Sequence, residues 1–212
     1  MHISTPKTSS FSPSRAPVPY IVRWSGERKG PMPVVMRPGG RGIRYADERT
    51  YDRDARGVLW SRMPSQPGRG KPEFGQVHSL RQRLTMAGLR CQICGGPADR
   101  NDAGVLWILD AHVDELRPGL KDTRHPPLCR PCAHRSVVAC PHLRKRFTVV
   151  RVRAFAPLGV EGVLYGLGPR GPEEVEAVSV AFDDVRLPYV RAHQLIMWLR
   201  DFTAIDLDDP EA

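Results

Sequence analysis

Apolar and polar side chains alternate along residues 147–155, which is the pattern of a half-exposed β-strand. Similar runs at 162–166 and 175–182 predict two more strands, and three antiparallel strands are the simplest arrangement. After Leu187-Pro188 the apolar spacing becomes that of a helix. Its stripe would consist of Val190, Gln194, Leu195, Met197, Trp198 and Leu199. The C-terminal part is therefore predicted to be a small antiparallel sheet followed by a helix.

The first 75 residues are rich in turn-forming residues and contain only short apolar runs. Residues 1–19 are dominated by Ser, Thr and Pro, which predicts a disordered arm. Residues 20–24, 33–36 and 57–60 are β-like and are separated by Gly- and Pro-containing segments. We expect a basic, Pro/Gly-rich segment with short strands over 20–75.

A helix is predicted immediately before the first cysteine. Its apolar positions, at approximately helical spacing, are Val77, Leu80, Leu84 and Leu89. Gly88 stands where a helix is expected to end, and Arg81 and Arg83 would point outward.

Four of the five cysteines form two Cys-x-x-Cys pairs, Cys91/Cys94 and Cys129/Cys132. In each pair two thiolates can converge on one ion, and the glycines after Cys94 allow a tight turn. Four thiolates complete a closed tetrahedral shell, which is the arrangement of a structural zinc site. The sequence therefore predicts structural Zn²⁺ as the cofactor, in preference to disulfides.

The fifth cysteine lies in Cys140-Pro141-His142. If residues 131–139 are helical, Cys140 lies roughly 12 Å along the axis from Cys132, too far to share its ion. A second metal site, a core contact and a helix stop remain open for it.

The net charge of +9 is unevenly distributed. Residues 1–90 carry 17 basic and 6 acidic side chains, whereas residues 147–212 carry 6 basic and 11 acidic ones. An anionic partner, either nucleic acid or an acidic protein, would suit the basic half. However, only 5 of the 32 basic residues are Lys, and an Arg excess with abundant Gly, Pro and Ala can also arise from a GC-rich genome.

The leading hypothesis is a non-catalytic binding protein that contacts nucleic acid through this basic region. The arginines and lysine predicted to make phosphate contacts are Arg41, Arg44, Arg81, Arg83, Arg144, Lys145 and Arg146. Nearby aromatic residues such as Tyr51 and Trp60 could stack on bases or anchor the short strands.

The order of helix, Cys-x-x-Cys-Gly, hairpin, Leu-Cys-x-x-Cys and helix over roughly 76–140 resembles a treble-clef zinc finger of the HNH nuclease type. In that family an Asp-His pair on the hairpin and a His after the last cysteine serve the catalytic cation. Here His112 matches the base, but Ala111 and Ala133 occupy the ligand positions. A one-residue offset would supply Asp110 and His134 instead.

We therefore interpret the resemblance as a zinc scaffold without the nuclease chemistry. An HNH-like nuclease is the first alternative, and a protein-interaction or assembly factor is the second. The predicted fold class is α+β, with a treble-clef-like zinc core at 76–146, sheet and helix at 147–205, and an acidic tail at 206–212. No membrane-spanning run or signal core is evident, which predicts a cytoplasmic protein.

Overall fold

The computed structural model describes residues 18–28, 30, 32–116, 121–143 and 146–209. Over these residues the protein has mixed α+β structure with two helices and mostly strands. The strands are β1 (Val22–Trp24), β2 (Val34–Met36), β3 (Ile43–Tyr45), β4 (Leu59–Trp60), β5 (Pro72–Val77), β6 (Arg100–Asn101), β7 (Gly104–Leu109), β8 (Lys121–Thr123), β9 (Thr148–Gly168), β10 (Gly171–Ala181) and β11 (Val190–Ala204). The helices are α1 (Ser79–Ala87) and α2 (Arg130–Ala139), with 3-10 turns η1 (Ser25–Glu27), η2 (Pro38–Gly40), η3 (Thr50–Asp52), η4 (Val113–Glu115) and η5 (Leu187–Tyr189).

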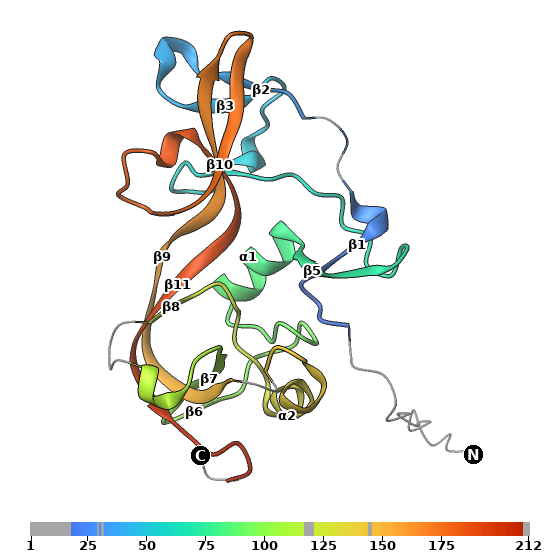
Figure 1. Ribbon diagram of the computed structural model, residues 1–212, viewed down its shortest axis with the longest axis vertical. Coiled ribbons are helices and arrows are strands. Elements are labelled where there is room, and N and C mark those ends of the chain that lie inside the picture. The colour runs from blue at the N-terminus through green and yellow to red at the C-terminus, as the bar shows by residue number, and fades with distance from the viewer. Residues whose placement is uncertain (1–17, 29, 31, 117–120, 144–145, 210–212) are drawn as a thin grey trace, which may run out of the picture.

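A curled seven-stranded sheet runs the length of the molecule (Figure 1). Its order is β4-β11-β9-β7-β6, with β10 paired to β9 and β8 paired to β11. The two strands predicted at 147–155 and 162–166 belong to one continuous strand, β9, and the run at 175–182 corresponds to β10. Most of the predicted disordered arm lies outside the described residues.

The predicted C-terminal helix is wrong, because this segment forms β11. Only Leu187–Tyr189 are helical, as the short turn η5. β11 pairs with β9 through several register shifts, including those between Ala192 and Gln194 and between Ile196 and Met197. Each such bulge inserts a residue and changes which face the next side chain occupies. The resulting burial pattern lacks strict alternation, because residues 195–197 are all buried in succession.

Helix α1 is confirmed, but it faces the opposite way from the prediction. Leu80 and Leu84 are 38% and 55% exposed, whereas Arg81, Gln82 and Met86 are buried. Val77 belongs to β5, and His78 caps the helix by accepting a hydrogen bond at Nδ1 from the Arg81 amide. Arg81 and Gln82 form hydrogen bonds with distant partners, which lets this face pack inward.

Gln82 fastens α1 to β11. Its side-chain amide donates to the Leu195 carbonyl at 2.9 Å and to the Arg124 carbonyl at 2.8 Å. Its Oε1 accepts from the Leu195 backbone N–H at 2.9 Å. The helix and the sheet are therefore joined by a complete amide pairing as well as by apolar contacts.

We expect Gln82→Leu to lower the free energy of unfolding by about 2 kcal/mol, because it leaves the buried Leu195 N–H without an acceptor. Leu84→Gln on the same helix should change it by less than about 0.5 kcal/mol, since that side chain is largely exposed. Urea unfolding of both variants measures the difference. Equal effects would contradict the inverted orientation of α1.

The main core lies between α1 and the seven-stranded sheet, including its strand β4. It includes Trp60, Met86, Trp107, Val150 and Leu199, each at most 3% exposed. A second apolar cluster joins β7 to α2 and the C-terminal segment. Neither helix in the described part of the chain has the length and apolar character needed to span a membrane.

Candidate metal centre and basic surface

The first cysteine pair lies in a tight turn just after α1. Gly88 ends the helix, and its N–H donates to the Leu84 carbonyl. The Cys91 N–H donates to the Gly96 carbonyl at 2.7 Å, and the Gly95 N–H donates to the Cys91 carbonyl at 2.8 Å. Gly95 has a φ of 73°, and a Cβ there would lie 3.0 Å from the Tyr20 ring. Glycine at this position thus allows both the turn and the contact with the N-terminal segment.

The second pair lies at the start of α2. Cys129 is the N-cap residue, and Cys132 lies in the first turn behind Pro131. The preceding Leu128 is buried, and its N–H donates to the Leu106 carbonyl of β7 at 3.0 Å. The helix start and the sheet therefore hold both cysteines at a fixed position.

The four thiols gather at one point, although 34 residues separate the two pairs. Their sulfur atoms all lie within 4.8 Å of one another, and the Sγ atoms of Cys94 and Cys129 are 3.8 Å apart. Cys91 and Cys132 are buried, Cys129 is partly buried and Cys94 is exposed. This group could hold one metal ion, and four cysteine ligands are the donor set of structural zinc sites.

The surroundings of the thiols bear on their charge. Burial and the neighbouring Cys129 raise the pKa of Cys132. Burial also acts on Cys94, but the hydrogen bond from the Gly96 N–H and contacts with the other thiols lower its pKa. The Arg135 guanidinium donates to Cys132 Sγ at 3.0 Å. Four thiolates this close repel one another, so a divalent cation would stabilise the fully deprotonated set.

The structure does not bring the alternative nuclease residues together. Asp110 pairs with Arg146 at 3.5 Å, and His134 on α2 lies 3.5 Å from Asp208. His112 is exposed and precedes η4. Among the described residues, the four cysteines are the one group of three or more side chains placed to share a metal ion.

Comparison of the chain with protein-family models, with curated proteins and with solved structures finds no match. The treble-clef and HNH resemblance therefore rests on the cysteine spacing and the order of elements, and it stays a prediction.

The predicted nucleic-acid residues differ widely in their environments. Arg81 is 3% exposed and forms a buried ion pair with Glu27, so its predicted outward orientation is wrong. Arg146 pairs with Asp110 and Glu115, while residues 144 and 145 lie outside the described part. Arg41 is exposed next to η2, and Arg44 donates to the Tyr45 carbonyl. Arg83 lies partly buried over the Trp60 ring.

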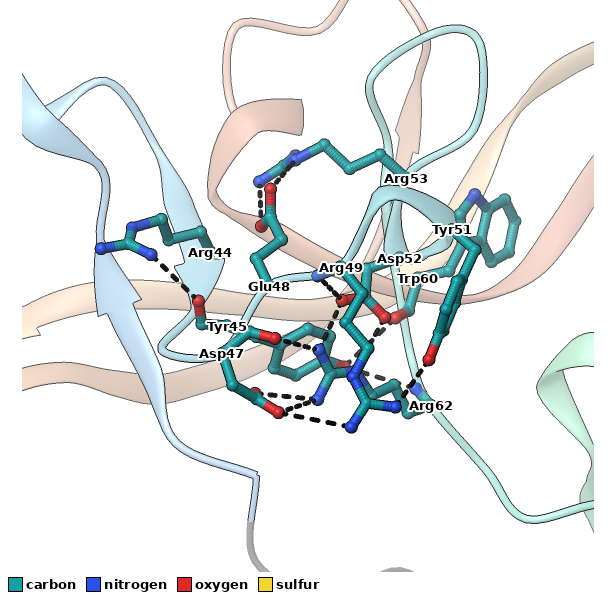
Figure 2. A network of polar contacts seen from close by, with 10 residues as sticks. All are labelled: Arg44, Tyr45, Asp47, Glu48, Arg49, Tyr51, Asp52, Arg53, Trp60 and Arg62. Carbon is teal, nitrogen blue, oxygen red and sulfur yellow. Dashed lines mark hydrogen bonds and ion pairs between the residues drawn. The ribbon is translucent and has the colours of Figure 1, made fainter.

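All six acidic residues of the first 90 have hydrogen-bonded partners inside the protein. Figure 2 shows the densest part, where Arg62 bonds to Asp47 and Asp52 and Arg53 bonds to Glu48. Elsewhere Glu27 pairs with Arg81, and Glu73 with Arg23 and Arg28. Asp54 accepts from the Trp60 indole and from backbone amides. The acidic groups are thus all engaged in contacts within the protein. The arginines that do not take part in these contacts supply the excess positive charge.

Proposed function

We propose that this is a zinc-stabilised binding protein that contacts nucleic acid through its basic N-terminal half, without catalysis. The observation that carries the proposal is the convergence of four cysteine thiols from two separate segments. A closed four-thiolate shell leaves no position for a substrate, so the metal would stabilise the fold and take no part in a reaction.

The nucleic-acid part of the proposal is supported by arginines that lack counter-ions. Arg37 and Arg41 flank η2 at the turn of the β2–β3 hairpin, and both are exposed. Within the described part of the chain neither side chain forms an ion pair or hydrogen bond. The hairpin lies at the upper end of the molecule in Figure 1, beside the β9–β10 hairpin. Such protruding arginines can reach phosphate groups without first breaking an internal ion pair.

We expect the purified protein to bind short nucleic-acid duplexes with an affinity that falls as salt rises. Replacing both hairpin arginines, Arg37→Gln with Arg41→Gln, should weaken binding and reduce the slope of log affinity against log salt by about 1 to 2. Fluorescence anisotropy at several salt concentrations measures both quantities. Arg100→Gln is the matched control, because Arg100 is exposed on β6 and far from the hairpin along the sheet.

Two outcomes would count against this proposal. Absence of binding at low salt would remove nucleic acid as the partner and favour an acidic protein. Divalent-dependent cleavage that is lost in His112→Ala would favour the HNH-like nuclease.

A further inference from the structure

A groove of about 360 Å³ opens between the segment after β4 and the start of α1. Its apolar wall is formed by Met32, Trp60, Met63 and Leu80. Three arginines also line it, namely Arg49, Arg62 and Arg83, but only one acidic residue does, Asp52. This Trp60 groove therefore combines an apolar surface with a net positive charge, and its volume is in the range of small-ligand sites.

Arg83 lacks an acidic partner in this groove. Its guanidinium carbon lies 4.5 Å from the centroid of the Trp60 ring, so the group is stacked on an apolar surface. Its Nη1 is buried and has no hydrogen-bond partner among the described residues. Burial lowers the pKa of Arg83, and the charge of Asp54 only partly opposes this shift. A buried donor of this kind is usually matched by an acceptor in the working state of a protein.

Arg62 lines the same groove, but its guanidinium is hydrogen-bonded to carboxylates of the protein. It bonds to Asp52 at 2.7 Å through Nε and to Asp47 at 2.8 Å through Nη1 (Figure 2). These contacts raise the pKa of Arg62 and fix its side chain. The contrast identifies Arg83, and not Arg62, as the groove arginine that has no acidic partner among the groove residues.

Tyr51 provides a flat aromatic surface at the rim. Its side chain is among the most exposed aromatics of the protein, at 65%, yet its hydroxyl is held by Arg49 Nη1 at 2.6 Å (Figure 2). The backbone beneath it is fixed as well, because Asp52 accepts a hydrogen bond from the Arg49 amide at 2.6 Å. An exposed but positioned ring of this kind can stack on a planar ligand at low entropic cost.

We propose that the Trp60 groove takes one unpaired nucleobase against Tyr51 and its neighbouring phosphate against Arg83. This inference rests on the proposed function and specifies the form of nucleic acid. In a duplex the bases are stacked on their neighbours and paired, whereas a single strand can turn one base outward onto an aromatic ring. The groove therefore gives the protein a preference for single strands that the exposed hairpin arginines do not provide.

The test compares a labelled homothymidine strand with a matched duplex by fluorescence anisotropy, using the full chain with its metal. Tyr51→Ala and Arg83→Gln are each expected to weaken strand binding about tenfold, the effect of losing one stacking contact or one charged phosphate contact. Neither should change duplex affinity more than the control Arg100→Gln. Thermal unfolding and metal content of every variant confirm that the fold is retained.

A second readout locates the base directly. A strand containing iodouracil should crosslink under ultraviolet light to a peptide that includes Tyr51 or Trp60. Crosslinks confined to the β2–β3 hairpin would overturn the inference.

The results separate this inference from the proposed function. If Tyr51→Ala and Arg83→Gln bind the strand like Arg100→Gln while the Arg37/Arg41 variant is weakened, the groove has no role and the basic-surface proposal stands. If the groove variants lose strand binding and the hairpin variant does not, the groove is the site and the hairpin proposal fails.

Discussion

Cys132→Ser should yield a protein that no longer retains zinc and unfolds at a much lower temperature than the wild type. Cys132 is fully buried, lies in the first turn of α2 and belongs to the four-thiol group. Structural zinc contributes about 10–16 kcal/mol of binding free energy in small sites, and this becomes folding free energy. A domain of ordinary stability, about 5–15 kcal/mol, cannot lose a large share of that and stay folded.

The expected damage is greatest around the cysteines. Cys91 and Cys132 pack in one apolar cluster with residues of β7, α2 and the C-terminal segment. Without the ion, the turn at residues 91–96 would lose its metal-mediated link to the start of α2. Far-ultraviolet circular dichroism against temperature and metal analysis by mass spectrometry measure the two effects.

Cys140→Ser is the matched control, because the same chemical change falls outside the group of four. That variant should retain one zinc per chain and the wild-type melting temperature. A chelator should shift the wild type toward the behaviour of Cys132→Ser. A metal-free Cys132→Ser protein that melts like the wild type would show that the thiols pack as ordinary core residues.

The sequence was sufficient to find the thiol group, because ligand chemistry imposes a short, recognisable spacing. Cys91 and Cys94 share one turn, and Cys129 and Cys132 share the first turn of a helix. Local rules also located α1, which ends at Gly88, although the residue with a positive φ is the next one, Leu89, at 49°. Features set within a few residues of one another were thus within reach of sequence reasoning.

The orientation of α1 was out of reach, because distant residues decide it. The buried Arg81 bonds to Glu27, which is 54 residues away in the sequence, and the buried Gln82 bonds to Leu195, which is 113 residues away. No local pattern reports such pairs, so the apolar spacing predicts the exposed Leu80 and Leu84 as the buried face. The Trp60 groove could not be predicted for the same reason, because its walls come from segments that are separate in the sequence.

The helix prediction for β11 fails for a different reason. Its register shifts break the strict alternation by which strands are recognised. The long partner β9, which keeps β11 extended, enters only through tertiary pairing.

Glu27→Ala should destabilise the protein by about 3–5 kcal/mol, the second largest effect that we expect. Glu27 is fully buried, and its two oxygens accept from Arg81 at 2.6 and 2.7 Å. They also accept from the backbone amides of Gln66 and Trp24. Removing the carboxylate leaves the charge of Arg81 buried without its counter-ion and removes one of the contacts between the N-terminal segment and α1.

Two further variants show whether the unpaired charge causes the loss. Glu27→Ala combined with Arg81→Met should be more stable than Glu27→Ala alone, since no uncompensated charge remains. Glu115→Ala removes a half-exposed partner of Arg146 and should cost less than about 1 kcal/mol. Urea unfolding at neutral pH ranks the three variants. Equal losses in Glu27→Ala and Glu115→Ala would contradict the importance of burial.

The pH dependence of the same pair gives an independent check. Burial disfavours the charged form of Glu27, but the hydrogen bonds from Arg81 and the two amides outweigh it and lower the pKa from 4.5 to about 2. Because the folded-state pKa is depressed, the stabilisation is complete above pH 4.5 and is lost as the pH falls from there toward 2. The stability difference between the wild type and Glu27→Ala should therefore shrink over this interval. Contributions from the thiol group are common to both proteins and cancel in the difference, so a gap that stays constant down to pH 2 would mean that Glu27 is not the ionised partner of Arg81.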